Sequence, residues 1–543
     1  MEPECSANMI DISNLPDAIL QHILFFLPIH DAASTSSLSK TWLRVWNSLP
    51  VFTFTFSQRN LGLAVPDFVN RVNQSLSPLH SNKAVIEEFF VSMNLSIQEH
   101  KDFVSDIDNW ISLVLRNCVR KLIIRISSPS QIYILSKPIF NSRFLVVVRL
   151  HGCKLPETTF DGARDFKYLK ELSLFNVVAD DYQVQKLINL CHSLEQLSVT
   201  LDHIMDFLDL DNFLMLHYVR VTVKLLRLNA INLQTLMFFG LQGLHLSDST
   251  INVKNLYCVF SPQIMTFNIL LQEMLSTFTL LEEFRLLLRI SVKSYRIRHC
   301  HLKILHLFGT IVPESPWQVE IDMPCLCHLY CHSHVFPSLC VISPSIKECE
   351  TLQLHIIRSH NNLRDCADIH RLGIFLQNFN QSIEVNLNDI CTENLITLEQ
   401  LQEQNLIPRA ATKIKKLILN SFSASSDYTY FLDALLFTCH PSYLLIETCV
   451  LNSDHFIKFL CCQLLGRQEN PACCRDNVVQ KCWRHFLKDV EVKCYKKLCE
   501  TEELSCFVSS DLSSTLSLCD TEKRVEFRFE WLEEPVCTSS HDL

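Results

Sequence analysis

Two clusters of cysteine and histidine are the residues best suited to chemistry, because thiolates and imidazoles are preferred ligands of zinc. They are Cys325, Cys327, His328, Cys331, His332 and His334, and then Cys461, Cys462, Cys473, Cys474, Cys482 and His485. The first cluster lies on a predicted strand, where neighbouring side chains point to opposite faces, and the second has long, irregular gaps. In a chain with 25 cysteines we expect structural thiols, and we predict no metal and no cofactor.

The common motifs of enzymes are missing. The eight glycines form no dinucleotide fingerprint, no phosphate-binding loop and no nucleophile elbow, and there is no His-Glu-x-x-His pair of zinc ligands. With so many cysteines and histidines, nothing singles out one catalytic pair of the two. We therefore predict no catalytic residue and no enzyme.

Composition restricts the partners and the compartment. The 543 residues carry a net charge of −10 without a dense lysine/arginine block, so no nucleic-acid partner is expected. No apolar run is long enough to span a bilayer, and the acidic start of the chain has no apolar segment of a secretory signal. We expect a cytoplasmic and/or nuclear protein, with no membrane partner and with reduced cysteines.

Residues 12–54 hold more apolar surface than so short a segment can bury alone. Asn14 is an acceptable N-cap, Pro16 fits a first helical turn and Pro28 stops the helix between them. Further helices are predicted around residues 31–38 and 41–48, the latter with two tryptophans. The first helix carries an apolar stripe at i, i+1, i+4, i+5 and i+8, namely Ile19, Leu20, Ile23, Leu24 and Leu27.

This segment resembles the F-box of plant-type F-box/leucine-rich-repeat proteins, through Leu15-Pro16, the stripe, Ala32-Ala33 and Ser39-Lys40. The resemblance implies docking on the S-phase-kinase-associated adaptor, which connects the F-box to a cullin scaffold. The alternative is an ordinary helical hairpin packed on its own domain. The residues expected in the adaptor-binding plug, some of which must instead hold the helices together, are Leu15, Pro16, Ile19, Leu20, Ile23, Leu27, Pro28, Trp42 and Trp46.

An L-x-x-L-x-L pattern recurs through the middle of the chain. Its first four copies begin at Val119, Leu145, Leu169 and Leu194, a spacing typical of leucine-rich repeats. Such units cannot bury their apolar faces alone and must stack into a solenoid. The period blurs between residues 200 and 279, where we expect strands with short returns in place of helices. The predicted fold is α/β: a three-helix F-box, then a curved parallel sheet with helices and irregular returns on its convex side.

The repeat strands offer a candidate binding face. Residues that alternate with the inward leucines face the concave side, and a mixture of charged, polar and aromatic side chains there suits a protein target. The alternative is a solvated face without a partner. The predicted target-binding residues are Arg149, His151, Glu171, Phe175, Gln196, Arg285, His306 and Phe308.

The sequence divides into an F-box (10–50), a linker and cap (51–105), a repeat array (106–345), an irregular continuation (346–436) and a C-terminal module (437–543). In the last, residues 486–492 resemble the opening strand of an FBD-type module. The helix expected next is poorly matched by residues 505–518, and the final strand alternates over residues 525–531.

The resemblance implies the substrate-recognition subunit of an SCF-type E3 ubiquitin ligase, a non-catalytic adaptor whose repeats hold an unknown target protein. Two alternatives stay open. One is a repeat scaffold that binds a partner without ubiquitin transfer. The other is a small-molecule sensor, which would need a basic pocket in the array, in the blurred region 200–280.

Overall fold

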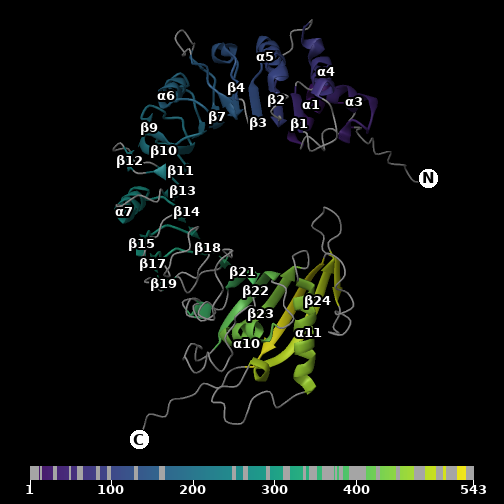
Figure 1. The fold of residues 1–543 in the computed structure, drawn as a ribbon, viewed down its shortest axis with the longest axis vertical. Coiled ribbons are helices and arrows are strands. Elements are labelled where there is room, and N and C mark those ends of the chain that lie inside the picture. Colours follow the sequence, from purple (N-terminus) through teal and green to yellow (C-terminus); the bar gives the residue numbers. More distant parts are fainter. Residues whose placement is uncertain are drawn as a thin grey trace, which may run out of the picture. The chain divides into compact units, whose positions relative to one another are not determined.

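The computed structural model describes residues 12, 15–27, 34–47, 51–57, 65–80, 86–94, 100–127, 132–157, 165–241, 243–246, 252–260, 267–288, 294–309, 318–333, 338–341, 351–356, 372–373, 376–377, 383–390, 411–422, 428–447, 453–469, 483–496, 505–508 and 523–532. The chain forms two compact units, Met1–Met205 and Asp206–Leu543 (Figure 1). The boundary falls inside the predicted repeat array, a division that the leucine period did not indicate.

The N-terminal helices of the first unit are α1 (Asp17–Phe26) and α3 (Lys40–Asn47). The prediction of Asn14 as N-cap is wrong: Pro16 is the N-cap, in an extended conformation, and its carbonyl accepts the backbone N–H groups of Ile19 and Leu20. Leu27 is extended ahead of Pro28, as a residue before proline should be. Of the predicted second helix, residues 34–38 are described and form a short helical turn.

Six parallel strands form the sheet of the first unit. They are β1 (Val51–Ser57), β2 (Glu88–Asn94), β3 (Lys121–Ser127), β5 (Val147–His151), β7 (Glu171–Val177) and β8 (Gln196–Leu201). The inward leucines of the repeats align across the strands: Leu122, Val148, Leu172 and Leu197 share one register row and all are buried. The period of the sequence therefore predicted this core correctly.

Helices accompany the strands of this unit, and Figure 1 shows α5 and α6 on the same side of the sheet. Phe68 packs edge-on against Trp110, with ring centroids 6.3 Å apart, and so connects α4 to α5. The remaining elements of the unit are α4 (Val65–Leu76), η2 (Ser77–His80), α5 (His100–Arg116), β4 (Tyr133–Ile134), η3 (Lys137–Asn141), β6 (Cys153–Lys154) and α6 (Asp181–Asn189).

Parallel strands continue in the second unit, paired in the order β10, β11, β13, β14, β16, β18, β20, β21, β22, β23. Three shorter strands, β15, β17 and β19, form a second parallel sheet. The bounds are β9 (Met205–Leu210, which contains the unit boundary), β10 (Tyr218–Leu228), β11 (Thr235–Leu241), β12 (Gly243–Leu246), β13 (Asn255–Phe260), α7 (Phe267–Thr277), β14 (Glu283–Leu288), β15 (Ser294–Arg298), β16 (Ile304–Gly309), β17 (Gln318–Asp322), β18 (His328–Ser333), β19 (Ser338–Val341), β20 (Thr351–Ile356), β21 (Glu384–Ile390), β22 (Thr412–Phe422) and β23 (Cys439–Glu447).

The blurred region resolves into long and short strands. The first half of β10 pairs with β11, and its second half, from Leu225, pairs with β12. The strand around Leu244 therefore adds no repeat of its own, because it pairs with the end of β10, a strand that already belongs to the array. The described residues between β10 and β13 contain no helix, as expected of short returns.

Antiparallel strands end the sheet of the second unit: β26 pairs with β23 and with β24, and β24 pairs with β25. Residues 505–518 are a poor match to the helix of an FBD-type module, and their described start, Ser505–Val508, forms the strand β25, while the remainder lies outside the described residues. The C-terminal elements are α10 (Thr429–Thr438), α11 (Ser453–Glu469), η5 (Trp483–His485), β24 (Leu487–Lys496), β25 and β26 (Lys523–Trp531). None of the helices described here combines the length and apolar character needed to cross a membrane.

Candidate docking surfaces

The apolar residues of α1 form two parallel rows with different surroundings. The inner row, Leu20 and Leu24, is buried against Trp42 and Val45 of α3. These four side chains are the core of the helical segment. Leu20 and Trp42 were both predicted in the adaptor-binding plug. Their side chains point instead into the core of the helical segment that would present the plug.

The outer row is offset from the inner row by one residue and consists of Leu15, Ile19, Ile23 and Leu27, each four positions after the last. Ile19 is 48% exposed and Leu27 is 37% exposed. Leu15 and Ile23 are half-buried at the edge of the core. Side chains four positions apart lie on one helix face, which holds for Ile19 and Ile23 of α1, while Leu15 precedes the N-cap and Leu27 is the extended C-cap. The outer row is therefore an aliphatic surface along α1 and its two ends, partly exposed at Leu15 and Ile23 and exposed at Ile19 and Leu27.

The helix α3 has apolar surface of its own. Leu43 is 45% exposed, and Trp46 is half-buried against the core. An ion pair between Arg44 Nη2 and Asp17 Oδ1, 2.7 Å long, connects α3 to the start of α1, although such an exposed pair adds little stability. Pro16 is exposed, and Pro28 lies outside the described residues.

In the first unit, five of the predicted target-binding residues lie on three adjacent strands. Arg149 of β5 forms a bidentate pair with Glu171 of β7, with Nη2 3.0 Å from Oε2. His151 packs edge-on against Phe175, with ring centroids 4.9 Å apart. Phe175 is 41% exposed, and Gln196 is an exposed neighbour of Glu171 on β8. The structure therefore brings these five residues together on one sheet face.

Arg125 of β3, which is absent from the predicted target-binding residues, belongs to the same face. Its guanidinium lies 6.0 Å from the ring centroid of Phe90 on β2, and it is the register partner of His151. Burial, and then the charge of Arg125, lower the pKa of His151. The imidazole is thus held neutral and acts on this face as an aromatic ring.

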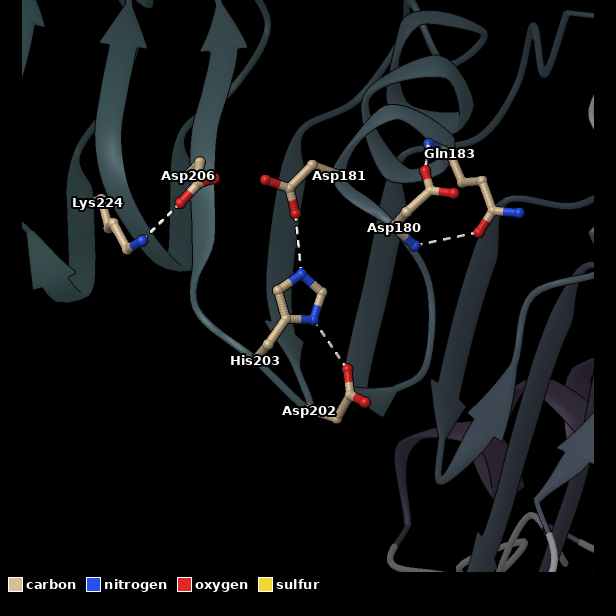
Figure 2. Close-up of polar contacts among 7 residues, drawn as sticks. All are labelled: Asp180, Asp181, Gln183, Asp202, His203, Asp206 and Lys224. Atoms are coloured by element: carbon tan, nitrogen blue, oxygen red, sulfur yellow. Dashed lines mark hydrogen bonds and ion pairs between the residues drawn. The ribbon is translucent and has the colours of Figure 1, made fainter.

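A histidine between two carboxylates lies where the chain leaves β8 (Figure 2). His203 Nε2 is 2.9 Å from Asp181 Oδ1, and Nδ1 is 2.9 Å from Asp202 Oδ1. Hydrogen bonds to Asp202 and Asp181 raise the pKa of His203. Asp181 is the first residue of α6, whose capping box joins Asp180 and Gln183. Since both ring nitrogens are occupied within the chain, the cluster ties the loop after β8 to α6 and offers no ligand site.

The remaining three predicted residues lie together on the second unit. Arg285 pairs with Glu283, with Nε 2.6 Å from Oε1. His306 stacks on Tyr330 with ring centroids 4.2 Å apart, and Phe308 stacks on His332 at 4.5 Å. These two stacked pairs form an aromatic surface over the adjacent strands β16 and β18.

The neighbouring strands of that surface carry residues that sequence reasoning missed. Arg220 of β10 lies over the ring of Phe239 on β11, with Cζ 5.4 Å from the ring centroid, and Phe239 packs on Tyr257 of β13. The alternation of the buried Val219 and Val221 with Arg220 is the sequence signal that could have located the start of this strand.

The cysteine/histidine clusters are dispersed where they are described. Cys331 is buried in the repeat core while Cys325 is exposed, and Cys461 is buried while its neighbour Cys462 is exposed. No group of three or more metal-ligating side chains converges among the described residues. His334, Cys473, Cys474 and Cys482 lie outside them.

Comparison with known proteins identifies both regions. The family model of the F-box domain matches residues 12–54. The model described as "FBD-associated F-box protein At5g56370, LRR repeats" matches residues 107–258. The chain therefore contains an F-box followed by leucine-rich repeats.

Relatives with the same organisation occur in Arabidopsis thaliana. Over 35% of this chain, the FBD-associated F-box protein At5g56700 is 31% identical, the F-box/FBD/LRR-repeat protein At1g13570 is 30% identical and the F-box/LRR-repeat protein At3g26922 is 29% identical. The matches span 46%, 44% and 58% of those relatives, or about half of their length. Over the F-box and the repeats, the chain is thus similar to F-box/leucine-rich-repeat proteins of plants.

Proposed function

We propose that this protein is the substrate-recognition subunit of an SCF-type ubiquitin ligase, acting in the cytoplasm, the nucleus or both. The F-box would dock on the S-phase-kinase-associated adaptor and, through it, on the cullin. The repeats would hold a target protein. The chain would carry out no bond chemistry, and its contribution would be to bring a lysine of the target close to a ubiquitin thioester on another subunit.

The outer row of α1 is the observation that carries the proposal. Among its described residues, the helical segment buries four apolar side chains in its core and leaves Ile19 and Leu27 in solvent. Exposed aliphatic side chains along one surface are a docking feature, and a helix face of i, i+4 anchors fits an apolar groove on a partner. The inner row would act indirectly, by holding α1 against α3.

Two faces of the repeats support a protein as the target. Each combines aromatic rings with arginine, the residue types that dominate protein interfaces: Arg125 with Phe175 on the first unit, and Arg220 with Phe239 on the second. The alternatives without ubiquitin transfer would use the same faces. Only docking of the F-box on the adaptor therefore distinguishes the ligase subunit from those alternatives.

The test is capture of the adaptor and the cullin on the full-length chain. The wild-type protein should retain both. Ile19→Asp places a charge in the outer row and should lose both, while Ile269→Asp makes the same change at a 69% exposed position of α7 and should lose neither. Unchanged capture by Ile19→Asp, or absence of the cullin from the wild-type complex, would contradict the proposal.

A further inference from the structure

The outward face of strands β10 to β18 contains an arginine without a counter-charge. Arg220 has no carboxylate partner among the residues that the structure describes, and its Nε is buried there without a hydrogen-bond acceptor. Its guanidinium is held in place by the Phe239 ring. A buried donor that lacks an acceptor is costly in a folded protein, and a carboxylate brought to the partly exposed guanidinium would supply the counter-charge that the described residues lack.

The other charges on this face cancel. Register pairing places Arg220, Met237, Tyr257, Arg285, His306 and Tyr330 side by side across six strands. Glu283 neutralises Arg285 and also lies 3.4 Å from His306 Nε2. Burial, and then the charge of Arg285, lower the pKa of His306 to about 4. At neutral pH this histidine is uncharged, and Arg220 is the positive charge that remains among these six positions.

An apolar row runs beside the charged one. Phe239, Leu287 and Phe308 occupy the next outward positions of β11, β14 and β16, and each is partly exposed. The face thus offers one cation at its β10 end and a band of rings and aliphatic groups beyond it. Arginine and aromatic residues in this arrangement are typical anchors for a protein segment.

We propose that this face binds an extended segment of the target protein that presents an Asp or Glu carboxylate to Arg220 and apolar side chains to the neighbouring strands. This inference rests on the proposed function in treating the bound protein as the ubiquitination target. A carboxylate is favoured over a phosphate because a single unpaired guanidinium matches one negative charge, whereas a phosphorylated side chain carries up to two.

The length of the segment follows from the strand spacing. Arg220 and Tyr330 are five strand spacings apart, or roughly 24 Å at about 4.8 Å per strand. An extended chain of about seven residues covers that distance at about 3.3 Å per residue. Heptapeptides are therefore the appropriate probe.

The experiment selects a displayed library of random heptapeptides on the full-length chain. We expect enriched sequences to carry Asp or Glu within two residues of an aromatic or large aliphatic residue. The best one is then synthesised with its acid, with the corresponding amide, and with phosphoserine at that position, and affinities are measured by fluorescence polarisation. The amide should bind roughly 10- to 100-fold more weakly, the loss expected for one charge-assisted hydrogen bond.

Arg227 provides the matched control. It lies on the same strand, over the Phe207 ring at 5.9 Å, but it is paired with Asp209 at 3.2 Å. Arg220→Met should lose affinity for the acidic peptide by about the same 10- to 100-fold factor, and Arg227→Met should keep it. Arg220→Lys retains the charge without the buried Nε and should lose less affinity for the acidic peptide than Arg220→Met. If Arg220→Met unfolds, the affinity of Arg220→Lys is the test.

Four outcomes overturn the inference: no enriched sequence, enrichment without an acid, full binding by Arg220→Met, or stronger binding of the phosphoserine peptide. Adaptor capture by the same Arg220→Met protein separates this inference from the proposed function. If Arg220→Met loses the peptide but still captures the adaptor, both this inference and the proposed function are supported. If the wild-type chain binds the peptide through its acid but captures no adaptor, the inference about the acidic segment stands and the ligase role is refuted.

Discussion

Replacing Leu20 by alanine should unfold the F-box while leaving the repeats intact. Leu20 is fully buried in a core that it shares, among the described residues, with Leu24, Trp42 and Val45. A buried Leu→Ala substitution costs about 3 kcal/mol, and in a small helical segment that loss should appear as local opening. At about 1.4 kcal/mol per factor of ten, amide exchange in α1 and α3 should accelerate roughly 100-fold.

Hydrogen exchange of the full-length protein, followed by mass spectrometry, measures this opening peptide by peptide. Peptides from α6, in the repeats, should exchange as in the wild type. Ile19→Ala is the matched control, because Ile19 is 48% exposed and surface substitutions change stability by about 0.5 kcal/mol or less. If Ile19→Ala accelerated exchange as much as Leu20→Ala, or if α3 did not respond to Leu20→Ala, the division of α1 into an inner and an outer row would be wrong.

Further predictions concern titration and capping. The pKa of His203 is raised by its two carboxylates, so the stability it contributes is present below its unfolded pKa of about 6.5 and is lost as the pH rises through the higher folded value. The difference in thermal midpoint between wild type and His203→Gln should therefore shrink from pH 5.5 to pH 8.5. His440 behaves oppositely: burial against Trp531 lowers its pKa to about 4, so stability should fall as the pH drops from about 6.5 toward that value, and the thermal midpoint of a His440→Phe variant should change less than that of the wild type over this lower pH range. Asp180→Ala removes the acceptor of the capping box and should cost about 1 kcal/mol, seen as faster amide exchange confined to α6.

The repeat core could be predicted from sequence because it depends on local alternation. Leu172 and Leu197 are buried in register since each strand needs only a period of two and a neighbour with the same pattern. The pairing of Leu244 could not be predicted. Its own pattern is that of a repeat strand, and its assignment depends on the unusual length of β10.

The candidate surfaces show the same limit. A stripe of five apolar residues on α1 is visible in the sequence, but which flank is buried depends on where α3 crosses it, so Ile19 and Leu20 could not be separated. The contact of Arg220 with Phe239 joins residues nineteen positions apart. It follows from the register of β10 and β11, which the blurred period of this region does not predict.

The affinity of the full-length chain for the purified adaptor is the most direct test of the central claim that the outer row of α1 is a docking stripe. Burying the exposed half of Ile19 contributes about 1 kcal/mol, and an unpaired charge in its place costs about 3 kcal/mol more, so calorimetry should find Ile19→Asp roughly 1000-fold weaker. Ile269→Asp should bind as the wild type does. Equal affinities for the wild type and Ile19→Asp would show that the stripe is not the surface that the adaptor binds.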